Sequence, residues 1–174
     1  MEIKSIKVNA RKKITVVTTI IFIIIVVTAI FNIYHQTHYL IIKDGKNNNN
    51  ITYYRLQDDL KFSIAFKHSV NQSMVEDRYI IKKGEIIVCE TVYYNFGAGV
   101  QTQLNEGETL RKREDGAMVI ENINKIIPEL YYNISPVYDH ILHVNNESIS
   151  LREVCKDSRT IVVEYSTRKP KEKE

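Results

Sequence analysis

Cysteine and tryptophan are scarce in this chain of 174 residues, which has two cysteines and no tryptophan. Cys89 and Cys155 are far apart and no Cys-x-x-Cys pair occurs, which excludes the spaced thiol motifs of zinc ribbons and thioredoxin-like enzymes. An oxidising compartment would permit a disulfide between them. We instead expect two unpaired, buried thiols within strands, because Cys89 lies in an apolar, strand-like run where cysteine acts as a small hydrophobic residue.

Charge is absent from the twenty residues Ile14 to Ile33. About 20 predominantly apolar residues are needed for a helix to cross a bilayer core, so this run predicts a transmembrane signal anchor at 14–33. A cleavable signal peptide is the alternative, with Val27-Thr28-Ala29 as a weak cleavage site. Basic residues stay on the cytoplasmic side, and their cluster before Ile14 predicts a single-pass cell-membrane protein with a cytoplasmic N-terminus.

A basic excess is missing from the rest of the chain. Residues 1–33 contain five basic residues and one acidic residue, whereas the remainder contains 19 basic and 20 acidic residues. The overall net charge of +3 therefore reflects membrane topology. Because the part after residue 33 is close to neutral, we expect no nucleic-acid partner.

Alternating hydrophobicity dominates the chain from residue 60 onward. Leu60, Phe62, Ile64 and Phe66 alternate with polar or small residues, as expected of a half-buried strand. Turn chemistry at Lys82-Lys83-Gly84, Asp115-Gly116 and Asn145-Asn146 separates further strand-like runs, and one helical turn is expected before Pro128. This pattern predicts an all-β fold, either a small β-sandwich or a partly closed barrel.

The composition shifts along the chain predict five segments. They are a cytoplasmic basic segment at 1–13, the transmembrane signal anchor at 14–33, a connector at 34–59, an external β domain at 60–166 and a charged disordered tail at 167–174.

The first candidate site contains His68 and Ser69, with Glu76 at the start of the next strand. By strand parity His68 is expected on the apolar face of Phe66, and Glu90 on the apolar face of its own strand. A carboxylate on an apolar face is costly unless it is paired. One interpretation is therefore a buried pair between His68 and a glutamate that joins two strands.

A second candidate site is the loop that follows Tyr93 and contains Gly97, Ala98 and Gly99. Such a loop exposes backbone N–H groups and lets a ligand or another strand approach closely. It is either a tight strand exit or a ligand loop that closes over His68, Ser69 and a glutamate. The third glycine and the helix of a dinucleotide-binding fingerprint are missing, which excludes that motif.

Catalysis is the third interpretation, with His68 acting together with Glu76 and Glu90. Neighbouring residues of a strand point to opposite sides, so the adjacency of His68 and Ser69 argues against a serine–histidine dyad. His140 and His143, three residues apart, are also expected on opposite faces, which weakens a zinc site because zinc needs three or four convergent ligands.

Three stretches in this order resemble the DUF1850 family, namely FSIAFKHSVNQSMVEDRYII, CETVYYNFGAGVQ and DHILHV. The resemblance covers roughly residues 60–165 and implies a small bacterial envelope protein without an established activity. It also implies association with tripartite, binding-protein-dependent (TRAP-type) transporters of the TAXI class. The residues that carry it are His68, Ser69, Val70, Glu76, Phe96, Gly97, Ala98 and Gly99.

From the residues and the resemblance we expect a non-enzymatic accessory or binding protein of a TRAP-type solute transport system. Its expected partners are transporter subunits or a small polar solute, with the membrane contacted through residues 14–33, and neither a cofactor nor a metal is expected. The expected binding residues are His68, Ser69, Glu76, Glu90 and Phe96–Gly99. The alternative is an envelope hydrolase or metal-dependent enzyme that uses His68 with Glu76 and Glu90.

Overall fold

The computed structural model describes residues 2–34, 36–57, 59–69, 72–94, 103–156 and 158–171. The chain divides into two structural units, Met1–Gln36 and Thr37–Glu174. Among the described residues, the first unit contains one helix, and the second contains twelve strands and a short helix.

The helix of the first unit is α1 (Glu2–Tyr34). Its threonine hydroxyls are satisfied by the helix itself, since Thr19 donates to the carbonyl of Thr15 at 2.9 Å and Thr28 to that of Ile24 at 2.9 Å. Within the part of the chain that is described, no helix combines the length and the apolar character needed to span a bilayer. The predicted span at 14–33 is therefore not confirmed.

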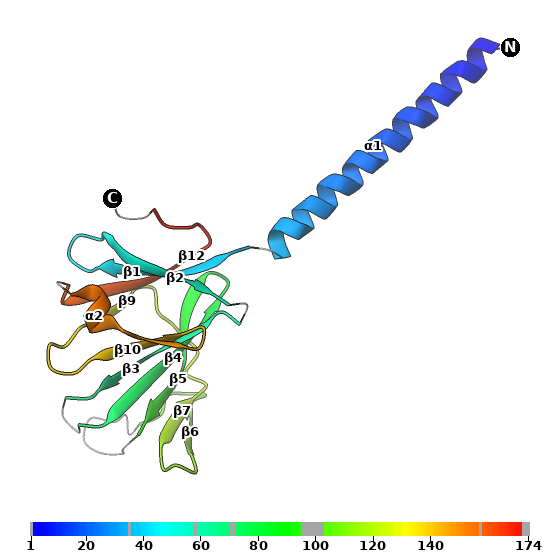
Figure 1. Ribbon diagram of the computed structural model, residues 1–174. Coiled ribbons are helices and arrows are strands. Elements are labelled where there is room, and N and C mark those ends of the chain that lie inside the picture. The colour runs from blue at the N-terminus through cyan, green and yellow to red at the C-terminus, as the bar shows by residue number, and fades with distance from the viewer. Residues whose placement is uncertain are drawn as a thin grey trace. The chain divides into compact units, whose positions relative to one another are not determined.

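Two antiparallel sheets form the second unit (Figure 1). The four-stranded sheet has the order β2-β1-β12-β9, and the larger sheet has the order β11-β10-β3-β4-β5-β7-β6 with β8 paired to β5. The strands are β1 (His38–Asp44), β2 (Asn50–Leu56), β3 (Lys61–Lys67), β4 (Met74–Lys82), β5 (Glu85–Tyr93), β6 (Thr109–Lys112), β7 (Met118–Glu121), β8 (Lys125–Ile126), β9 (Leu130–Asn133), β10 (His140–Val144), β11 (Glu147–Ser150) and β12 (Thr160–Ser166). The short helix is α2 (Leu151–Cys155).

One hydrophobic core joins the two sheets. Leu40 and Ile161 of the four-stranded sheet and Ile64 and Leu142 of the larger sheet are fully buried in the same cluster. The predicted all-β class of this unit is confirmed. Among the described strands the two sheets do not close into a barrel.

Two predicted hairpin turns are confirmed by their backbone geometry. Lys83 and Gly84 have φ values of +55° and +83°, and Asn145 and Asn146 have φ values of +52° and +65°. Two successive residues with positive φ match the twist of a two-residue antiparallel hairpin, and asparagine and glycine adopt this conformation at low cost.

The predicted connector at 34–59 is wrong, because residues 38–56 form the hairpin of β1 and β2 within the four-stranded sheet. Leu40 and Ile42 of β1 are completely buried. The asparagine-rich run is the turn of this hairpin and the start of β2, rather than a spacer. A continuous apolar run flanked by turn residues is typical of such a buried strand.

Two smaller predictions are also corrected. No helical turn forms before Pro128, because Asn122 and Asn124 have φ values of +63° and +47° and the chain continues as β8. Cys155 lies in α2 rather than in a strand. In the predicted tail, the Lys169 ammonium lies 5.6 Å from the centre of the Tyr53 ring, and the disorder of this segment stays a prediction.

Replacing Ile42 tests whether the β1–β2 hairpin belongs to the core. We expect Ile42→Ala to lower the free energy of unfolding by about 2–5 kcal/mol, because it leaves a cavity beside fully buried neighbours. Lys46→Ala, on the exposed turn, should change it by less than about 0.5 kcal/mol. Urea unfolding followed by tyrosine near-ultraviolet circular dichroism measures both, and equal effects would contradict this assignment.

Candidate functional site

A row of polar side chains crosses the face of the larger sheet that points away from the core. The strand register places Ser148, His143, Ser63, Arg78 and Glu90 directly opposite one another on β11, β10, β3, β4 and β5. Because side chains alternate along a strand, most of their neighbours in sequence point into the core instead, with Cys89 beside Glu90 as an exception. The row therefore presents hydrogen-bonding groups at each successive strand.

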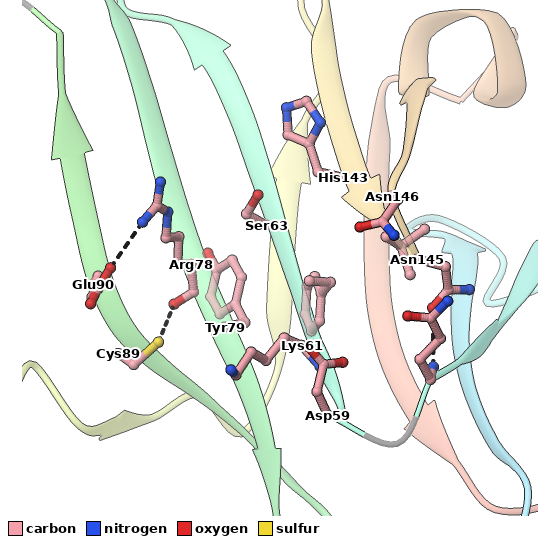
Figure 2. A pocket seen from close by; sticks show the side chains of 13 residues that line it. Asp59, Lys61, Ser63, Arg78, Tyr79, Cys89, Glu90, His143, Asn145 and Asn146 are labelled. Atoms are coloured by element: carbon pink, nitrogen blue, oxygen red, sulfur yellow. Dashed lines mark hydrogen bonds and ion pairs between the residues drawn. The ribbon is translucent and has the colours of Figure 1, made fainter. Parts of the chain in front are cut away.

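A groove of about 480 Å³ lies along this row. Figure 2 shows Arg78 between Glu90 on one side and Ser63 and His143 on the other. Residues of the β2–β3 connection and the β10–β11 turn complete the lining, namely Gln57, Asp59, Asn145 and Asn146, together with Lys61 at the start of β3. The volume is that of a site for a small molecule.

Arg78 is held between two carboxylates from neighbouring positions of the sheet. Its Nε lies 3.2 Å from Oε1 of Glu76, and its Nη1 lies 3.1 Å from Oε2 of Glu90. Hydrogen bonds between ionised groups are stronger than neutral ones, so the two contacts fix the guanidinium plane over β4. The three charges sum to one negative charge at the centre of the row.

Glu76 is the more buried of the two carboxylates. Its Oε1 also accepts a hydrogen bond of 2.7 Å from Ser63, and its Oε2 one of 3.3 Å from Tyr94. Burial raises the pKa of Glu76, but the hydrogen bonds from Arg78 and Ser63 outweigh it and hold the pKa below its usual value. Glu76 is therefore ionised at neutral pH and is poorly suited to act as a general acid or base there.

A β-bulge directs the side chains of β5 toward the groove. Arg78 pairs with Glu90 but Tyr79 pairs with Val88, so Cys89 is the extra residue between them. Cys89 and Glu90 both line the groove, and the Cys89 thiol donates to the carbonyl oxygen of Arg78 at 3.2 Å. Burial raises the pKa of this thiol, which favours its unreactive protonated form.

The structure brings together only part of the predicted site. Glu76 and Glu90 meet through Arg78, whereas His68 and Ser69 are not among the described residues that line the groove. His68 follows the end of β3 at Lys67 and lies in a turn, where its backbone N–H donates to the carbonyl of Ser73 at 2.8 Å. Strand parity therefore does not apply to His68.

Four predicted binding residues, Phe96, Gly97, Ala98 and Gly99, lie outside the described part of the chain, and so does Val70. Their predicted role stays a prediction. The expected opposite placement of the two later histidines is confirmed, since His143 lines the groove and His140 is buried in the core.

Sequence reasoning missed Arg78 and Ser63, which organise the groove. The signal was present, because Glu76 and Arg78 are two residues apart on a strand and must share a face. Assigning Glu76 to His68 instead obscured this pair. The register that places Glu90 beside Arg78 depends on the bulge at Cys89, which alternation alone does not reveal.

The opposite face of β4 carries a second polar cluster, inside the core. Asp77 accepts hydrogen bonds from Thr91 at 2.8 Å and from Tyr132 of the other sheet at 3.1 Å. The hydroxyls of Tyr79 and Tyr132 are 2.6 Å apart. Burial raises the pKa of Asp77 and, together with the charge of Asp77, those of both tyrosines.

His140 lies beside this cluster and is 8% exposed. Its ring stacks on Phe66 with 5.3 Å between ring centres and meets Tyr132 edge-on at 5.7 Å. Its Nδ1 is buried and has no hydrogen-bond partner in the described structure. Burial lowers the pKa of His140, with a smaller opposing effect from Asp139.

No group of three or more His, Cys, Asp or Glu side chains within the described ranges could hold a metal ion.

The structure shows an all-β domain with a polar groove on the outer face of one sheet. Residues 62–151 match the family described as domain of unknown function (DUF1850), so the chain belongs to this family. Searches of curated proteins and of solved structures found no match.

Removing Arg78 should expose the repulsion between Glu76 and Glu90. The pKa of Glu76 is lower in the folded state than in the unfolded chain, so ionised Glu76 stabilises the fold at pH values above the unfolded pKa. This stabilisation is lost as the pH falls through the pKa of the folded state. We expect Arg78→Met to lower the free energy of unfolding at pH 7 by about 1–3 kcal/mol, less than for a fully buried pair because Arg78 is partly exposed.

The matched control is Arg111→Met, which removes the exposed 2.7 Å ion pair with Glu121 and should cost at most about 1 kcal/mol. Chemical unfolding at pH 7 and pH 3 distinguishes the two. A loss for Arg78→Met that is as large at pH 3 as at pH 7 would show that lost packing, not charge, causes it.

His140 should make the domain less stable in mild acid. The pKa of His140 is lowered in the folded state. Its contribution to stability is therefore present at pH values above the unfolded pKa of about 6.5, and it is lost as the pH falls toward the folded pKa. The loss should reach about 1.4 kcal/mol for each unit by which the pKa is lowered. Asp77 has the opposite effect, because its pKa is raised in the folded state. Its contribution to stability is present at pH values below its unfolded pKa and is lost as the pH rises through its folded pKa.

Unfolding between pH 7.5 and 5.5 should therefore show a slope that His140→Phe abolishes. Comparing the protein with and without His140→Phe in an Asp77→Asn background separates the effect of His140 from that of Asp77. The control is His143→Phe on the outer face, which should keep the slope. An unchanged slope in His140→Phe would refute the assignment.

Proposed function

We propose that this DUF1850 protein is a non-enzymatic accessory protein of a TRAP-type solute transport system. Residues 14–33 anchor it in the cell membrane, and the β domain lies on the extracytoplasmic side. The uncharged helical run and the basic residues before it support the anchor and its orientation.

The polar groove carries this proposal. It displays a charged and hydrogen-bonding row on a rigid sheet, and such a surface recognises polar groups on a solute or on a transporter subunit. His68, Ser69 and the segment Phe96–Gly99 form a second part of the proposed contact surface, because they carry the family resemblance.

The electrostatics favour binding over hydrolysis. A general acid or base works best with a pKa near the operating pH, whereas the contacts of Glu76 hold its pKa low. Arg78 occupies the space between Glu76 and Glu90 where a shared proton or metal would sit. The geometry of Glu76 and Glu90 therefore does not support the alternative of an envelope hydrolase or metal-dependent enzyme.

Site-specific photo-crosslinking in native membranes tests the proposal. A photoreactive amino acid at Lys61, which lines the groove, should capture subunits of a TRAP-type transporter. The same group at Lys112, exposed on the edge strand β6, serves as the control and should capture at least about fivefold less. Mass spectrometry identifies the products, and equal capture from both positions, or capture of no transporter subunit, would refute the accessory role.

A further inference from the structure

Arg78 and Glu90 form an ion pair in the groove in which neither group is fully engaged. A guanidinium has five N–H donors, and three hydrogen bonds to Glu76 and Glu90 use only part of them. Only Oε2 of Glu90 is engaged, so Oε1 has no partner within the described structure. The two side chains are 38% and 32% exposed, and both can be reached from the groove.

Glu76 has a different role in the same cluster. Its side chain is only 13% exposed and accepts hydrogen bonds from Ser63, Arg78 and Tyr94. Glu76 therefore holds the guanidinium of Arg78 in place, whereas Glu90 is the carboxylate that a ligand can reach. Arg78 stays oriented even when a ligand competes for its outer N–H groups.

Other groups of the groove add donors around this pair. The Nδ1 atom of His143 is engaged by Ser148 at 2.9 Å, which leaves Nε2 as the ring nitrogen available to a ligand. The Lys61 ammonium and the Asn146 amide line the same groove and have no partner in the described structure.

The charges select the kind of ligand. A simple carboxylate bound to Arg78 would lie beside the negative charges of Glu76 and Glu90, and a simple amine bound to Glu90 would lie beside Arg78. Each would meet an uncompensated like charge, which is costly in a partly desolvated site. A molecule that carries both groups on one carbon atom compensates both at once.

We propose that the groove binds a zwitterionic solute of the amino-acid type. The ligand carboxylate accepts hydrogen bonds from the remaining N–H groups of Arg78, and the ligand ammonium donates a hydrogen bond to Oε1 of Glu90. This inference rests on the binding role proposed for the groove and specifies the class of solute.

Ligand-observed NMR on the full-length protein in detergent tests the inference. The probes are the twenty proteinogenic amino acids, each added singly, with propionate and ethylamine as the carboxylate-only and ammonium-only analogues. We expect saturable binding of at least one amino acid and at least about tenfold weaker binding of both analogues. Saturable binding of none of the twenty, or equal binding of propionate or ethylamine, would overturn the proposal.

Two conservative variants assign the contacts. Glu90→Gln should weaken amino-acid binding at least about tenfold and leave propionate binding unchanged or stronger, because it removes an anion without changing shape. Arg78→Lys keeps the positive charge but loses the planar guanidinium, which can hold a carboxylate through two N–H groups. It should weaken amino-acid binding similarly. Arg111→Gln, outside the groove, is the control and should bind as the unmodified protein does. Wild-type affinity in Glu90→Gln would overturn the assigned ammonium contact.

The outcome is independent of the crosslinking experiment. Capture of transporter subunits without amino-acid binding would overturn only the solute class. Amino-acid binding without such capture would overturn only the transporter role.

Discussion

The pairing of β4 with β3 and β5 is the constraint on which the rest of this domain depends. Alternation along β4 places Asp77 and Tyr79 in the core and Glu76 and Arg78 on the outer face. A one-residue slip would exchange these two sets and leave charges in the core. The strand is therefore held in register by apolar contacts on one side and by ion pairs on the other.

The inner cluster has a structural meaning of its own. Tyr132 reaches Asp77 from the opposite sheet, so a hydrogen bond crosses the core between the two sheets. Buried polar groups that are satisfied in only one arrangement favour that arrangement over alternative packings. The cluster thus defines how the two sheets align, whereas the surrounding isoleucines and leucines supply most of the burial.

Alternation and turn chemistry were sufficient to predict the all-β class, the β4–β5 hairpin and the β10–β11 hairpin, because these depend on neighbours in sequence. The pairing of β1 with β12, which joins residues 38–56 to the four-stranded sheet, was not predictable in this way, since the two strands lie more than one hundred residues apart. Glu76 and Glu90 were found as candidates, but Arg78 between them was not. Its importance depends on a register that includes a bulge.

The unpaired thiols have a consequence for how this domain forms. Cys89 and Cys155 are both free, and burial raises the pKa of Cys155 to about 11, which keeps it protonated and inert. The fold is thus complete without any covalent link between distant segments. Strand pairing and core packing therefore hold the distant segments together, and neither thiol takes part in a cross-link.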